Sequence, residues 1–249
     1  MSAPVFLADP ADVARAAQGE TFTLRGDEGH HAAVVQRRRA GEEIHITDGD
    51  GTRLCGIITA VTGKEVSIAV QEVLTEPPAN PQITLVQALI KGGGDEALSF
   101  ATEAGVDVVI PWQADRAISR WSAEKQDKNR QKWQTTVLQA AKQARRAFVP
   151  TVRDVVYSRR LAMEIEEFTE KGSPVLLAHE EATQRIPDVI DAVQVGDEVM
   201  ILIGPEGGFS DDEVVLFVSA GAQQVSIGPH VLRAVHAGGL AVALVRNAA

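Results

Sequence analysis

A glycine-rich turn at residues 204–208, Gly-Pro-Glu-Gly-Gly, is the segment of this chain best suited to bind a ligand. It follows the apolar run of residues 199–203 and precedes residues 210–213, whose Ser-x-x-Glu spacing is that of a helix capping box. The pattern predicts a strand, a turn and a helix that stops at Gly221. Glycine tolerates positive φ and has no β-carbon, so the backbone of this turn can approach a flat ligand closely.

A second turn of this kind follows one helix later. Residues 223–227 predict another strand, and Gly228 begins a turn that leads through Leu232 and Arg233 into a helix of small residues over 234–245. Ligands of parallel sheets bind beyond the carboxyl ends of the strands, where both turns are expected. The two turns therefore predict one binding site made largely of backbone groups.

These motifs resemble the RsmE family of 16S ribosomal RNA methyltransferases, within the SPOUT superfamily. That family's C-terminal signature runs Leu-Ile-Gly-Pro-Glu-Gly-Gly, a helix, then Leu-Gly-x-x-Ile-Leu-Arg. Similar blocks cover nearly the whole chain: His30-His31 with Arg37, Gly41-Glu42, Asp48-Gly49, Lys91, residues 101–107, Ile110-Pro111, Arg116, and residues 140–143 with Arg146. The resemblance implies methylation of N3 of one uridine near the ribosomal decoding site by a homodimer that uses S-adenosylmethionine.

The resemblance also implies which residues bind the cofactor, in a C-terminal trefoil knot. Residues 177–179 end a further strand and are similar to the family's remaining cofactor loop. Leu202, Ile227 and Leu232 are expected to supply apolar walls. The full set of expected cofactor-binding residues is Leu177, Ala178, His179, Leu202, Ile203, Gly204, Pro205, Glu206, Gly207, Gly208, Ile227, Gly228, Val231, Leu232 and Arg233.

Two residues are the catalytic candidates, Arg233 and Glu206. The Arg233 guanidinium can hold a phosphate or a uracil carbonyl and can stabilise uridine as its N3 anion; the alternative is an ion pair at a helix end or between subunits. Uridine N3 becomes a nucleophile only when its proton leaves, so a base is needed. Glu206, His230 and His236 have suitable side chains, and each also has a structural interpretation.

The chain departs from the family pattern at three places. Residues 234–237, Ala-Val-His-Ala, replace the common Thr-Glu-Thr-Ala; residues 91–96 replace a Lys-Gly-Asp-Arg block; and Lys142 replaces a common Glu. These changes are either lineage variation or a sign of altered activity. Two alternatives stay open: a knotted methyltransferase that acts on another RNA such as transfer RNA, and a non-catalytic RNA-binding or ribosome-assembly module.

The charge distribution is uneven. The whole chain has a formal net charge of −10, but residues 112–160 contain 12 Lys and Arg against 4 Asp and Glu, or +8. Because phosphates must be neutralised by cations, this segment is the expected RNA-binding region, with a solvated helix face as the alternative. Trp112, Trp121 and Trp133 can stack on bases or form core and dimer contacts. The expected RNA-binding residues are Arg37, Lys91, Arg116, Arg120, Lys142, Arg145 and Arg146.

The pattern of strands and helices predicts two domains. Residues 1–75 contain strand-like segments at 22–24, 43–47, 55–61 and 65–70, which predict a small β-barrel; by resemblance it is PUA-like and binds RNA. Residues 76–81 contain three prolines and form the predicted linker. In residues 82–249, strands at 83–89, 106–110 and 175–178 alternate with helices at 96–104 and 125–148, which predicts an α/β domain with a parallel sheet. The knot is implied by the resemblance alone.

Composition favours a cytoplasmic protein. Cys55 is the single cysteine, which excludes an intrachain disulfide and a cysteine-based zinc cluster. Neither a signal peptide nor a membrane span is predicted. No metal site is expected, since His30-His31 lacks a third ligand at a suitable spacing, and residues 91–94 lack the order of a phosphate-binding loop.

Overall fold

The computed structural model describes residues 3–192 and 198–248 of the 249-residue chain. The chain forms two compact units: Met1–Pro78 with the separate segment Ala141–Val149, and Ala79–Ala140 with Pro150–Ala249. The first boundary falls within the predicted linker. The segment Ala141–Val149 belongs to the first unit, whereas the sequence pattern places it in the second.

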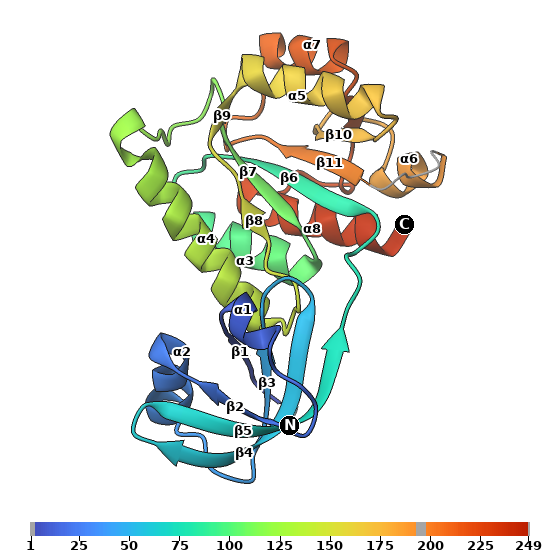
Figure 1. Ribbon diagram of the computed structural model, residues 1–249. Helices are drawn as coiled ribbons and strands as arrows, with labels where there is room; N and C mark the ends of the chain where they lie inside the picture. Colours follow the sequence, from blue (N-terminus) through green and yellow to red (C-terminus); the bar gives the residue numbers. More distant parts are fainter. Residues whose placement is uncertain (1–2, 193–197, 249) are drawn as a thin grey trace. The chain divides into compact units, whose positions relative to one another are not determined.

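The first unit is built on a five-stranded sheet with the order β1-β3-β4-β5-β2 (Figure 1). Strand β1 pairs parallel with β3, and the other pairs are antiparallel. Register shifts in β4 after Cys55 and Ile58 mark bulges, which bend a strand and increase its twist. The bounds are β1 (Val5–Leu7), β2 (Thr21–Leu24), β3 (Glu43–Thr47), β4 (Thr52–Thr62) and β5 (Glu65–Thr75), with helices α1 (Pro10–Val13) and α2 (Gly26–His30) and a π-helical turn at His31–Val35.

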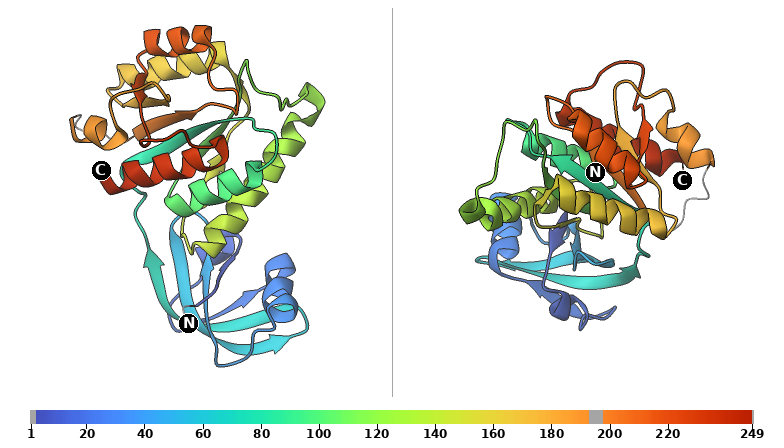
Figure 2. Two further views of the ribbon diagram at one scale, coloured as in Figure 1. Left: turned by 180° about the vertical axis from the view of Figure 1, so that it is seen from behind. Right: turned by 90° about the horizontal axis from the view of Figure 1, so that it is seen from above.

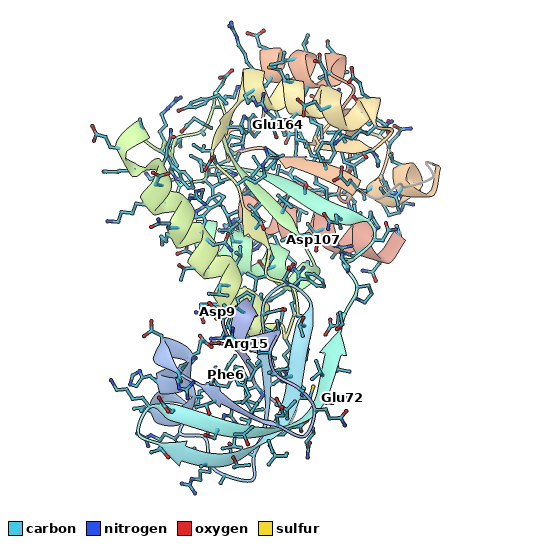
Figure 3. All side chains as sticks on the ribbon, in the orientation of Figure 1. Phe6, Asp9, Arg15, Glu72, Asp107 and Glu164 are labelled. Atoms are coloured by element: carbon cyan, nitrogen blue, oxygen red, sulfur yellow. The ribbon has the colours of Figure 1, made fainter. Side chains whose placement is uncertain are left out.

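The curled sheet encloses its own apolar core. Phe6, Ile44, Leu54 and Ile68 are fully buried there, and Phe6 lies inside the sheet in Figure 3. The observed β3 matches the predicted strand at 43–47, while β4 and β5 extend beyond the predicted segments.

The segment Ala141–Val149 corrects one prediction. A helix was expected over residues 125–148, but α4 (Gln126–Gln143) ends earlier, and Arg145 has a positive φ of 57°. The backbone beyond the helix forms other hydrogen bonds: Thr47 Oγ1 donates to the Ala147 carbonyl at 3.0 Å, and Arg53 donates to the Arg145 carbonyl at 2.9 Å. The long-range partners of this segment thus override its local preference for helix.

Lys142 is a second correction, because it was expected to contact RNA. Its side chain is 7% exposed, and its Nζ lies 2.5 and 2.7 Å from the two carboxylate oxygens of Glu28. Glu28 also accepts a hydrogen bond from the Leu7 backbone, and the ammonium lies 5.6 Å from the centroid of the Phe6 ring. A cation with these buried partners stabilises the first unit and is not available to a phosphate.

The second unit contains a sheet in which every strand pair is parallel. Its order is β12-β10-β11-β6-β7-β8, and β9 also pairs with β7. This confirms the predicted α/β class. The strands are β6 (Gln82–Ala88), β7 (Val108–Gln113), β8 (Thr151–Val152), β9 (Val156–Tyr157), β10 (Val175–Ala178), β11 (Glu198–Ile203) and β12 (Gln223–Val225).

Helices cover both faces of this sheet (Figure 1, Figure 2). Helices α3 (Gly94–Ala104) and α8 (Ala234–Ala248) lie on one face, together with apolar residues of α4 and of α6 (Ile186–Ala192). Helices α5 (Ser158–Glu170) and α7 (Asp211–Ser219) lie on the other, where Trp112 and Phe217 are fully buried. None of the described helices is both long and apolar enough to span a bilayer.

The Lys142–Glu28 pair yields a test of the fold. Replacing Lys142 with Ala leaves a mostly buried carboxylate without its cation, so we expect the free energy of unfolding of the first unit to fall by about 3 kcal/mol. Urea denaturation followed by circular dichroism measures this loss. Lys128→Ala removes an exposed cation of the same helix and should leave the midpoint within error; equal midpoints for the two variants would contradict the assignment.

Candidate functional site

A cavity of about 760 Å³ opens where β10, β11 and β12 end. The strands are in register, since Leu177 lies opposite Leu202 and Gln224, so their carboxyl ends meet at one edge of the sheet. The segments that follow the three strands form the walls, as expected for a parallel sheet. The cavity thus lies where the two glycine-containing turns were predicted to meet.

Most of the residues expected at this site do line the cavity. They are Ala178, His179, Ile203, Gly204, Pro205, Glu206, Gly207, Gly208, Ile227, Gly228, Val231 and Leu232. Leu177 and Leu202 do not, because alternate residues of a strand face opposite sides of a sheet. Both are fully buried with Trp112 and Phe217 on the side of α5 and α7. Leu202 is therefore a core residue, and the expectation that it forms a wall of the site is wrong.

Glycine is suited to the three positions of the first turn for different structural reasons. Gly208 has the predicted positive φ, at 68°. A β-carbon on Gly204 would lie 3.0 Å from Cε2 of Phe209, and one on Gly207 would lie 3.3 Å from Cβ of Arg116. Positive φ was expected to be open to all three, but close packing is what favours glycine at 204 and 207.

The turn is held in place by the buried carboxylate of Glu213, which is 1% exposed. The predicted capping box is present: Ser210 N donates to Glu213 Oε2 at 2.9 Å, and Glu213 N donates to Ser210 Oγ at 3.2 Å. The other oxygen, Oε1, accepts from Asp115 N and from Ser158 Oγ, both at 2.8 Å. One side chain therefore joins the start of α7 to the loop after β7 and to the start of α5.

Arg116 is expected to bind an RNA phosphate, and its guanidinium, which stays exposed, also has partners within the fold. It donates to the Phe209 carbonyl at 2.7 Å and to Asp211 Oδ1 at 3.3 Å, and the residue lines the cavity. Arg116 thereby braces the glycine turn. Its partners lie more than 90 positions away in sequence, and no local pattern signals them.

The two catalytic candidates differ in their surroundings. Glu206 lines the cavity and is exposed; its Oε1 accepts from the backbone N of Lys91 at 2.7 Å. Arg233 is exposed and immediately follows Leu232, a wall residue, but does not itself line the cavity. Within the described part of the chain its guanidinium has no ion pair or hydrogen bond, while its carbonyl accepts from the N of His236 at 2.9 Å. The guanidinium is thus free to contact a molecule at the edge of the site.

The candidate histidines differ in their position relative to the cavity. His230 lines the cavity, whereas His236 is exposed on α8 and does not. His179 also lines the cavity, and its Nδ1 accepts from the backbone N of Glu181 at 3.3 Å. No cluster of three or more His, Cys, Asp or Glu residues that could hold a metal is found among residues 3–192 and 198–248.

The remaining cations expected to contact RNA are distributed over both units. Arg37, Lys91, Arg120 and Arg145 are exposed, and Arg146 is half-buried. Arg37 and Arg145 both have positive φ, 54° and 57°, which is uncommon for residues other than glycine and is associated with functional or strained positions. These two arginines both belong to the first unit.

Comparison with known proteins gives consistent matches. Residues 77–246 match the model of an RNA methyltransferase domain. The chain is 40% identical over 229 residues to the ribosomal RNA small subunit methyltransferase E of Mycobacterium tuberculosis, covering 91% of this chain and 86% of that protein. It is 28% identical over 223 residues to the protein of the same name from Bacillus subtilis, covering 87% and 86%.

Solved structures match over nearly the full length. A putative methyltransferase of Legionella pneumophila in complex with the bound cofactor SAM has a TM-score of 0.81 and 26% identity, covering 100% of this chain and 98% of that one. The ribosomal RNA small subunit methyltransferase E of Neisseria gonorrhoeae, bound to S-adenosyl methionine, has a TM-score of 0.82 and 24% identity, with coverages of 97% and 96%. The second likeness establishes the fold.

The Glu213 contacts can be tested independently of any ligand. In Glu213→Gln an amide NH₂ replaces one carboxylate oxygen, so at least one buried donor loses its acceptor, and we expect the free energy of unfolding to fall by about 2 kcal/mol. Thermal and urea denaturation measure it. Asp212→Asn, at an exposed neighbouring position, is the matched control. A Gln variant as stable as this control would show that the buried contacts contribute little.

Proposed function

The chain belongs to the RsmE family of small-subunit ribosomal RNA methyltransferases, and from this membership we propose that it methylates N3 of one uridine of 16S ribosomal RNA near the decoding site, with S-adenosylmethionine as cofactor. The observation that carries the proposal is the cavity at the carboxyl ends of β10, β11 and β12, walled by the two predicted turns. The family relationship supports an activity on ribosomal RNA. The cavity supports a site for a nucleoside-sized cofactor.

The walls of the cavity fit S-adenosylmethionine in size and chemistry. A volume of about 760 Å³ is within the range of small-molecule sites. Ile203, Ile227 and Leu232 offer apolar surface to the adenine faces, and the backbone of residues 204–208 offers N–H and C=O groups to the adenine edge and ribose. When bound, the cofactor supplies a methyl group activated by a sulfonium centre, so the protein must mainly position the acceptor.

The methyl acceptor must be activated by the protein, whereas the methyl donor must only be positioned. Uridine N3 carries a proton that must leave before the nitrogen attacks a methyl group. Glu206 Oε1 already accepts a backbone hydrogen bond, which orients the carboxylate in the cavity and leaves Oε2 to receive the N3 proton. The unpaired guanidinium of Arg233 stabilises the negative charge that develops on the uracil carbonyl oxygens.

The two units have separate tasks in this proposal. The first acts as a PUA-like barrel that docks RNA, supported by its curled five-stranded sheet and by exposed Arg37 and Arg145. The second acts as the SPOUT domain of a cytoplasmic homodimer, with a C-terminal trefoil knot. Support for the knot comes from the strand order, in which β11 inserts between β6 and β10 while β12 pairs on the far side of β10.

Cofactor binding is the direct test of the cavity. Isothermal titration with S-adenosylmethionine and with its demethylated product should show saturable binding to the wild-type protein. Gly204→Ala places a methyl group 3.0 Å from the Phe209 ring and shifts the turn, so we expect its affinity to fall about tenfold. A melting curve of this variant checks that it is folded. The absence of binding heat for wild-type protein with both compounds would refute the methyltransferase proposal.

Arg233 is tested by kinetics. Arg233→Ala removes charge stabilisation of the acceptor but not a wall of the cavity, so turnover on 30S subunits should fall about a hundredfold while the dissociation constant of the cofactor changes little. Arg233→Lys keeps the charge and should recover part of the rate. Lys171→Ala is the control, because it removes an exposed cation just after the C-terminal end of α5. Unchanged turnover in Arg233→Ala would remove this residue from the mechanism.

The same assay separates the remaining alternatives. Methyl transfer to 30S subunits but not to transfer RNA supports the proposed substrate, and the reverse preference indicates a related methyltransferase with another target. RNA binding without methyl incorporation indicates a non-catalytic module, in which residues 234–237 have lost the family's side chains.

A further inference from the structure

A second cavity lies in the second unit, at the loop that follows β6. Its volume is about 310 Å³. Its walls come from the loop after β6, which contains Gly92, Gly93 and Gly94, from the segment before α4 that contains Trp121, and from α4 itself, which contributes Asn129 and Trp133. The volume is at the lower end of the range for small-molecule sites and suits one nucleotide.

This cavity is separate from the cofactor cavity but adjoins it. The two have no lining residue in common. Ile90, which lines the second cavity, belongs to the same small apolar cluster as Ala234, which lines the first. The loop between them is fixed to the cofactor turn, because Lys91 N donates to Glu206 Oε1 at 2.7 Å and Gly93 packs so closely on Val235 that a β-carbon would lie 2.9 Å from its Cγ2. The loop after β6 therefore lies between residues that line the two cavities.

The side chains of the second cavity combine aromatic surface with unused polar groups. Trp121 and Trp133 form an edge-to-face pair with centroids 5.1 Å apart, and each retains some exposure, 9% and 7%. The amide of Asn129 and the hydroxyl of Ser119 have no hydrogen-bond partner within the part of the chain that the structure describes. Lys132 pairs with Asp95 at 2.8 Å at the same cavity. An amide offers a donor beside an acceptor, which matches the edge of an RNA base.

We propose that this cavity receives one unstacked base of the RNA substrate, a neighbour of the methylated nucleotide. The inference rests on the proposed function, since it assumes that RNA reaches the cofactor cavity. The face of the base contacts the indole rings of Trp121 and Trp133, and its polar edge forms hydrogen bonds with Asn129 and Ser119. The loop between the two cavities keeps this base away from the methyl group. The second cavity therefore holds and selects the RNA, and the neighbouring nucleotide is the one that is methylated.

Tryptophan fluorescence provides a readout that does not depend on activity. Trp112 is buried in another cluster but stacks on Phe209, which lines the cofactor cavity. The titration is therefore made with that cavity saturated with S-adenosylmethionine, so that a further change in emission reports on Trp121 and Trp133. Titration with uridine 5′-monophosphate at up to millimolar concentration should quench the emission saturably. Asn129→Ala should weaken this binding about tenfold through loss of its hydrogen bonds. Gln131→Ala, an exposed position of the same helix outside the cavity, should bind as the wild type does.

Kinetics with 30S subunits supply the second half of the test. Asn129→Ala should raise the KM for RNA about tenfold while the affinity for S-adenosylmethionine stays unchanged, because the cofactor cavity is not altered. The absence of saturable quenching, or equal nucleotide affinity and equal KM in Asn129→Ala and Gln131→Ala, would overturn the inference. A wild-type protein that binds the nucleotide but no S-adenosylmethionine would instead refute the proposed function, so the two failures are distinguishable.

Discussion

The buried carboxylate of Glu213 is the interaction on which the geometry of the site depends. It accepts hydrogen bonds from Ser210, Asp115 and Ser158, which belong to three different segments of the second unit. A carboxylate in an interior is costly unless donors satisfy it, and here the donors come from the start of α7, the loop after β7 and the start of α5. These bonds restrain the helix start that directly follows the glycine turn, and such restraint before binding lowers the entropic cost of binding a ligand.

The proposed recognition of the cofactor by backbone groups agrees with the glycine-rich walls of the cavity. The packing of Phe209 and Arg116 against the turn favours glycine at 204 and 207, and all four residues line the cavity. Arg116 donates to the Phe209 carbonyl and completes this support. In the proposed reaction, the side-chain chemistry belongs to Glu206, which lines the cavity, and to Arg233, which follows the wall residue Leu232.

The acidic chain concentrates its cations, but not all of them are available to RNA. Lys142 forms a buried ion pair with Glu28 inside the first unit, whereas Arg116 donates to the Phe209 carbonyl and keeps an exposed side chain. Both lie in the segment with a local charge of +8. Arg37, Lys91, Arg120 and Arg145 keep their side chains at the surface. Local charge thus predicts where an RNA-binding region lies, whereas the identity of each contact depends on which cations find carboxylates or carbonyls within the fold.

Local patterns are sufficient to predict several features: the strand at Glu43–Thr47, the strand at Val175–Ala178, the capping box at Ser210 and the two turns at one edge of a parallel sheet. Helix α5 and the π-helical turn at His31–Val35 were not anticipated. The end of α4 at Gln143, the orientation of Leu202 toward the core and the burial of Lys142 become known from the folded chain. Periodicity and capping act over a few residues, whereas the partners of Lys142 and of the segment after α4 lie about a hundred positions away and are brought close by folding.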